Sequence, residues 1–184
     1  MKKTLTKSEL LSDLRDRIQE HHETVAEVFQ PLDAGKLNWQ DNRKEWSIIQ
    51  CFDHLNLTHE YYLPKIEGVL SNLKPADPHQ DIYKPSFWGR IYMYFAFNPK
   101  YSFPTAEEIT PQSESDRAVL DIYLMKQDGL SEILDQVGEI DLGRTPVTLE
   151  KGIKFNLGDC LKVLVYHDDL HIEQAKGILA AMQP

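Results

Sequence analysis

The stretch LVYHDDLHIEQ, residues 164–174, places two histidines four positions apart within a segment of helical apolar period. His167 and His171 therefore leave the same side of a helix, one turn apart. At about 100° per residue, that side is otherwise apolar or small. Its other members are Cys160, Leu164, Ala175, Ile178 and Met182. The two imidazoles thus interrupt the face that the helix turns toward the protein core.

Burying two imidazoles without partners would cost several kcal/mol in total. A divalent metal ion would satisfy both, because a histidine pair at this spacing can place two nitrogens on one ion. The alternative is that each histidine hydrogen-bonds to a facing helix. A catalytic metal site commonly has three protein ligands and one open position, so the metal hypothesis requires a third ligand.

Four further histidines are candidates for that third ligand. His54 and His59 lie in a second amphipathic segment, and His21 and His22 lie in the first. On a helical wheel, His59 falls inside the apolar face of its segment and His54 falls on the flank of that face. The periodicity of the apolar residues alone therefore slightly favours His59 as the third ligand.

Helical apolar periodicity is found in four segments, and none shows the alternation of a half-buried strand. They run over residues 8–29, 48–73, 114–137 and 156–182. Ser47 with Gln50 forms a capping box at one helix start, and Asn156 can cap the last helix. We predict an all-α protein, a four-helix bundle with a long crossover between helices 2 and 3, as a single domain over residues 1–184.

The crossover, residues 74–112, is too long to be a plain connection in a compact domain. It is rich in proline, and it carries too many aromatic residues for a solvated loop. We expect it to form a short helix near residues 87–95 that packs over one end of the bundle. Ordinary core packing is the expected role of its aromatic side chains, and a substrate-pocket wall is the alternative.

Composition excludes several classes of protein. Lys and Arg number 20 against 29 Asp and Glu, and this net charge of −9 does not suit nucleic acid or an anionic membrane surface. The longest apolar run, residues 91–97, is far shorter than the ~20 residues of a spanning helix. The charged N-terminus does not resemble a signal peptide, and two cysteines make no disulfide framework. We therefore expect a cytoplasmic protein.

Two motifs resemble a known family. Trp46-Ser47 followed by His54-Leu55 is similar to the W-S…H-L signature of the DinB-like superfamily. Residues 167–174 resemble the H-x-x-x-H-x-x-Q pattern on the last helix of that family. The resemblance extends, by motif spacing and helix order, over nearly the whole chain.

The resemblance implies a four-helix bundle with a long crossover and one divalent metal ion, often nickel or zinc, held by three histidines. Carried over by position, these are His54, His167 and His171. The family pattern thus selects His54, whereas the helical wheel favours His59. Some relatives are S-transferases or isomerases that use a low-molecular-weight thiol. The crossover is longer and more aromatic than is usual in the family, so no substrate preference is carried over.

Three neutral imidazoles would leave the ion its full charge, so a bound water could be acidified toward pH ~7, or a thiol deprotonated. We therefore predict a metal-dependent enzyme, a hydrolase or a thiol-dependent S-transferase, that acts on a small molecule. The alternative is a non-catalytic bundle that binds a metal or a ligand. Dinucleotide, P-loop and α/β-hydrolase motifs do not occur in the sequence. A homodimer formed through helix faces is a further expectation.

Four residues are candidates for supporting roles around the metal. Asp168 could hold a ligand imidazole by its free N–H, or form a salt bridge to a neighbouring helix. Gln174 lies nearly one turn past His171, where it could orient a ligand or cap a polar seam. Glu60 and Tyr61 could face the pocket as acid, base or hydrogen-bond donor, with a solvated face as the alternative.

Overall fold

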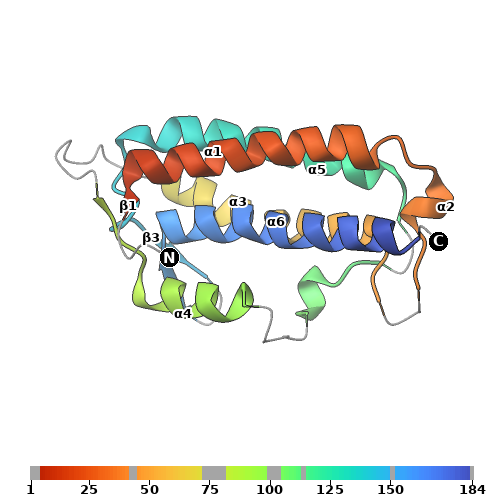
Figure 1. Cartoon of the computed structure of the whole chain (residues 1–184). Helices are drawn as coiled ribbons and strands as arrows, with labels where there is room; N and C mark the ends of the chain where they lie inside the picture. The colour runs from red at the N-terminus through yellow and green to blue at the C-terminus, as the bar shows by residue number, and fades with distance from the viewer. Residues whose placement is uncertain are drawn as a thin grey trace.

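The computed structural model describes residues 5–41, 45–71, 82–98, 105–112, 115–149 and 152–182. Within these residues, four long helices run along a common axis (Figure 1). They are α1 (Lys7–Thr24), α3 (Ile48–Leu70), α5 (Ala118–Gln136) and α6 (Leu157–Ala181). Both α1 and α3 pack against α5 and α6. The predicted all-helical class is confirmed, and each long helix lies within one of the four periodic segments except that α1 begins one residue earlier, at Lys7.

Shorter elements join the long helices. One group is helical: η1 (Val25–Phe29), which continues α1, then α2 (Ala34–Leu37), α4 (Phe87–Ala96), η2 (Glu107–Ile109) and η3 (Val137–Glu139). The other group comprises two antiparallel pairs, β1 (Leu5–Thr6) with β2 (Ile82–Tyr83) and β3 (Pro146–Thr148) with β4 (Lys154–Asn156). The sequence did not predict these strands, because two or three residues are too few to display a period of two.

Capping boxes fix where three of the long helices begin, and those of α3 and α6 were predicted from the sequence. At α3, the Ser47 hydroxyl accepts from the Gln50 backbone N–H, and the Gln50 side chain accepts from the Ser47 N–H. At α6, the Asn156 side chain accepts from the Asp159 N–H at 2.7 Å. A fixed helix start also fixes the direction of every later side chain on that helix. The predicted caps thus help to determine where the histidines of α3 and α6 point.

The buried apolar residues form two clusters, one toward each end of the long helices. On each long helix, a buried polar residue lies in sequence between members of the two clusters. These residues are His21 on α1, His59 on α3, Gln127 on α5 and Asp168 on α6. They are at most 3% exposed, and we call them the buried polar layer. Since buried polar groups must be hydrogen-bonded, this layer constrains how the four helices align.

Part of the predicted crossover, residues 74–81 and 99–104, lies outside the described residues. The short helix expected near residues 87–95 is present as α4, which packs on α6 and β4 (Figure 1). The expectation that its aromatic side chains pack in the core is wrong for Phe87, Trp88 and Tyr94, which are 53–61% exposed. The physical reason is that α4 buries only its Gly89 and Met93 side.

Among the residues that the structure describes, no helix combines the length and the apolar character needed to cross a membrane.

Candidate metal centre

Three imidazoles from two helices converge near the middle of the long axis of the helices. The Nε2 atom of His167 lies 3.3 Å from Nε2 of His54 and 3.2 Å from Nε2 of His171. One nitrogen of each ring lies within 4.8 Å of the others, and no other such group of histidine, cysteine or acidic side chains occurs in the described part of the chain. The structure thus brings His54, and not His59, to the histidine pair of α6.

Hydrogen bonds on the far side of two rings determine which nitrogen carries the proton. Nδ1 of His54 lies 2.6 Å from the backbone carbonyl of Ile109, and Nδ1 of His171 lies 2.8 Å from Oε1 of Gln174. Both partners are acceptors, so Nδ1 must donate in each case. In a neutral ring, Nε2 then presents a lone pair toward the centre of the cluster.

His167 is held differently. Its Nδ1 is buried and has no hydrogen-bond partner among the described residues. Its ring contacts His54 and His171 edge to face, with ring centroids 5.0 and 4.6 Å apart. No hydrogen bond on the Nδ1 side therefore orients this ring, and its contacts with His54 and His171 do so instead.

The environment keeps all three rings neutral near pH 7. Burial lowers the pKa of His54 despite the hydrogen bond to Ile109. Burial and the neighbouring His171 and His54 lower the pKa of His167 well below its ordinary value. Burial, followed by the charge of His54, lowers the pKa of His171 to about 4. Neutral imidazole is the form that binds a metal ion, so the site is ready for one without first losing protons.

These lowered pKa values predict an acid sensitivity of the metal-free protein. Below about pH 6.5 the unfolded chain takes up protons on these histidines, whereas folded His171 does so only near pH 4. His171 therefore reduces the free energy of unfolding by up to about 1.4 kcal/mol per pH unit as pH falls through this window. Chemical denaturation with a chelator present, from pH 7 to 4.5, should show a shallower fall for His171→Gln than for the unmodified protein. Parallel profiles would contradict the lowered pKa.

An indole covers one side of the imidazole cluster. The Trp46 ring lies 4.8 Å from the His54 ring and 5.5 Å from the His171 ring, measured between centroids. Sequence reasoning placed Trp46 in a family motif and at the start of a helix, where it could pack against Cys51, and missed this contact. The residue precedes α3, so helical periodicity does not place it.

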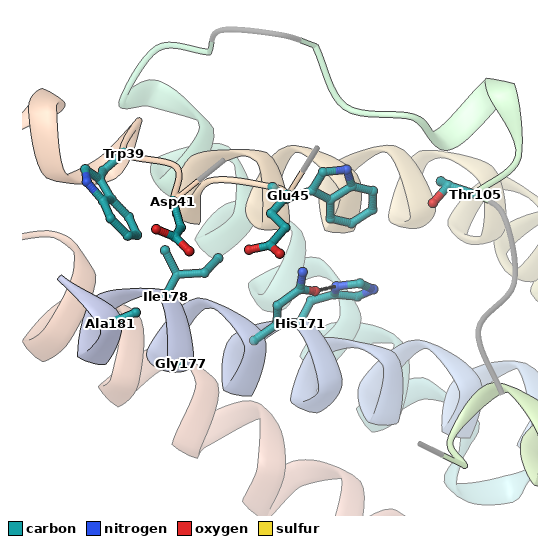
Figure 2. A pocket seen from close by; sticks show the side chains of 10 residues that line it. Trp39, Asp41, Glu45, Thr105, His171, Gly177, Ile178 and Ala181 are labelled. Atoms are coloured by element: carbon teal, nitrogen blue, oxygen red, sulfur yellow. Dashed lines mark hydrogen bonds between the residues drawn. The ribbon is translucent and has the colours of Figure 1, made fainter. Parts of the chain in front are cut away.

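A pocket of about 550 Å³ opens beside this indole and His171. Figure 2 shows it between α6 and the segment that precedes α3. Its lining residues are Trp39, Asp41, Glu45, Trp46, Thr105, His171, Gln174, Gly177, Ile178 and Ala181. The imidazole cluster therefore borders a space large enough for a small organic molecule.

The supporting candidates from the sequence occupy distinct places. Gln174 contacts His171, as described above, which is the orienting role considered for it. Asp168 lies in the buried polar layer, where its two oxygens lie 3.0 and 3.1 Å from Nε2 of His59 and one accepts from Gln127 at 2.7 Å. His21 joins the same layer through contacts with Gln127 and Asp169. Asp168 thus lies beside the cluster as a buried carboxylate and holds His59.

The remaining candidates make other contacts. Glu60 forms an ion pair with Lys126 on α5, with N and O 2.6 Å apart, and its side chain is largely exposed. The Tyr61 ring packs edge to face against Tyr62, and the Lys65 ammonium lies over its face. His22 pairs with Asp128 on α5. None of these contacts involves the three clustered histidines.

The fold and the site define a class: a protein of packed long helices with a candidate three-histidine metal centre beside an open pocket. The sequence model of the DinB superfamily matches residues 17–175, which include all three histidines. The chain belongs to the DinB superfamily, and the resemblance seen in its motifs is confirmed. No curated protein and no solved structure gives a significant match.

Proposed function

We propose that this protein is a metal-dependent enzyme in which His54, His167 and His171 hold one divalent ion, nickel or zinc. Its substrate is a small molecule, and its reaction is hydrolysis or transfer involving a low-molecular-weight thiol. The observation that carries the proposal is the convergence of three neutral imidazoles on one point at the edge of a pocket. Membership of the DinB superfamily supports it.

The spacing of the nitrogens fits such an ion. Metal–nitrogen bonds of about 2.0–2.1 Å at tetrahedral angles place ligand nitrogens roughly 3.3–3.4 Å apart. The separations from His167 to His54 and to His171 are 3.3 and 3.2 Å, and the third separation, between His54 and His171, is at most 4.8 Å. Nε2 of both His54 and His171 presents a lone pair, and a single N–H on His167 can point at only one of them. A cation shared by the three atoms removes the remaining lone-pair repulsion.

A bound divalent ion acidifies a water or thiol that reaches it, and this supplies the nucleophile for hydrolysis or transfer. The chain's own residues orient the rings and shape the pocket. The Ile109 carbonyl and Gln174 fix the tautomers of His54 and His171, so that both direct Nε2 inward. Trp46 shields one side of the cluster from water.

Metal titration of the purified, chelator-treated protein tests the proposal. We expect zinc and nickel to bind with one equivalent per chain, measured by calorimetry and elemental analysis. The loaded protein should then turn over a member of a panel of ester, amide and thiol-transfer substrates, with a series of thiol cosubstrates. Activity should disappear in the metal-free protein. One equivalent of metal with no turnover across the panel would favour a non-catalytic binding bundle instead.

Gln174 offers a test of ligand orientation. Its replacement by alanine removes the acceptor that fixes the His171 tautomer, so we expect metal affinity to fall by about 10- to 100-fold. Competition with a chromophoric chelator would measure this change. Replacement of Glu173, which is exposed and pairs with Lys176, by alanine is the control and should leave affinity unchanged. Equal affinities in both variants would exclude an orienting role.

A cytoplasmic location and a homodimer also remain predictions. Sedimentation velocity of the purified chain would test the oligomeric state directly.

A further inference from the structure

Ligation of a metal ion by His167 changes what the far side of its ring must do. Without an ion, the Nε2 atoms of His54 and His171 both present lone pairs to Nε2 of His167, so His167 carries its own proton there. Ligation uses the Nε2 lone pair, so the proton of the neutral ring must lie on Nδ1 instead. That atom is buried and has no partner among the described residues. Such a buried N–H opposes metal binding unless an acceptor lies near it.

The ring of His59 offers an acceptor. Its Nε2 lies 3.0 and 3.1 Å from the two carboxylate oxygens of Asp168, which only accept, so Nε2 donates. Nδ1 of the neutral His59 ring therefore holds a lone pair, and this atom too is buried without a partner in the described part of the chain. A donor that lacks an acceptor and an acceptor that lacks a donor thus occur on two helices that pack together, α6 and α3.

His59 lies close to His167 but outside the imidazole cluster. Two consecutive residues of α6, His167 and Asp168, contact His54 and His59 of α3. These two α3 histidines are five residues apart, which is about 7.5 Å along the helix. Nε2 of His167 faces His54, so Nδ1, on the other side of the ring, faces away from the cluster. Burial, followed by the charges of His171, His54 and His59, lowers the pKa of His167, so His59 is near enough for its charge to act on this ring.

Two other buried polar atoms lack partners among the described residues, Oδ1 of Asn56 and the hydroxyl of Tyr123. The Asn56 amide donates to the Val119 carbonyl of α5, and Tyr123 itself belongs to α5. Both atoms therefore lie on the side of α3 that packs against α5. His59 is held instead by a carboxylate of α6, the helix that carries His167.

We propose that His59 is a positioning residue of the metal centre: its Nδ1 accepts the Nδ1–H of the ligating His167, directly or across one buried water. This inference rests on the proposed function, because it requires an ion at the three histidines. Asp168 supports the arrangement, since its carboxylate holds the proton of His59 on Nε2 and leaves Nδ1 free to accept. The buried polar layer thus serves metal affinity as well as the alignment of the helices.

Two substitutions separate the roles of the two His59 nitrogens. His59→Gln places an amide N–H near the position of Nε2 and keeps a donor for Asp168, but it leaves no acceptor at the position of Nδ1. His59→Asn places an amide oxygen near the position of Nδ1 and loses the donor to Asp168. We expect His59→Gln to bind zinc about 10- to 100-fold more weakly than the unmodified chain, measured by competition with a chromophoric chelator. His59→Asn should bind zinc more tightly than His59→Gln while unfolding at a lower urea concentration.

His21→Gln is the matched control. His21 is a buried histidine of the same polar layer, and it contacts Gln127 and Asp169 but not the cluster. Its replacement should leave zinc affinity unchanged. A merely structural role of His59 would instead make zinc affinity follow stability across all three variants.

Nitrogen-15 NMR of the histidine side chains tests the proton positions in the unmodified, zinc-loaded protein. We expect His167 to be protonated on Nδ1, and His59 to be protonated on Nε2 alone. A proton on Nδ1 of His59 would overturn the inference alone, as would a zinc affinity of His59→Gln equal to that of the unmodified chain or no lower than that of His59→Asn. An unmodified chain that binds no zinc or nickel would overturn the proposed function, and this inference with it.

Discussion

Replacing His167 with alanine is expected to lower the affinity of the chain for zinc or nickel by at least about 100-fold, more than the loss of a supporting contact costs. His167 is the central ring of the cluster, because its Nε2 lies within 3.3 Å of both other Nε2 atoms. Its removal leaves two nitrogens on different helices with no third to complete the site. Elemental analysis of protein purified without chelator should fall from near one equivalent to a trace.

The control for this result is His22→Ala, which removes a histidine of α1 that pairs with Asp128 and lies outside the cluster. It should retain full metal content. Circular dichroism verifies that His167→Ala is folded, and His54→Ala supplies a second ligand variant from a different helix. If His167→Ala and His54→Ala both retain near-stoichiometric metal, the three-histidine site does not exist.

The histidine pair of α6 was predictable, because its geometry is local. A spacing of four residues on one helix fixes the relative direction of the two side chains. The periodicity of the apolar residues shows which direction faces the core. The third histidine was not predictable by the same means. The helical wheel favours His59, and His59 is indeed fully buried. Its partner is Asp168 and not the histidine pair, however. Helical periodicity indicates that a residue is buried, but it does not identify the residue's partner.

Other residues of the site come from segments whose apolar residues show no helical periodicity. The carbonyl that fixes His54 belongs to Ile109 in the crossover, and the indole that covers the cluster precedes α3. Asp168 follows His167 directly, so it points about 100° around α6 into the space between α3 and α5. A helical wheel of α6 gives this direction, but it does not show which neighbouring helices lie there. The pocket likewise depends on Trp39, Asp41, Glu45 and Trp46, whose positions no local pattern determines.

Replacing Asp168 with alanine should be the most destabilising single change in the buried polar layer. Its carboxylate is fully buried, lies 3.0 Å from Nε2 of His59, and accepts from Gln127 at 2.7 Å. Its loss leaves two buried donors unsatisfied at the level where all four long helices meet. Since removal of one partner of a buried polar pair costs about 3–5 kcal/mol, we expect the free energy of unfolding to fall by that amount in urea denaturation.

Asp128→Ala is the matched control, because its carboxylate also pairs with a histidine but its side chain is 69% exposed. Exposed pairs contribute little, so this variant should stay within about 0.5 kcal/mol of the unmodified protein. Asp168→Asn keeps an acceptor for His59 and should lose less stability than Asp168→Ala. A loss in Asp168→Ala no larger than that in Asp128→Ala would show that hydrogen bonding in the polar layer does not hold the four helices in alignment. The two apolar clusters would then have to fix the alignment by packing alone.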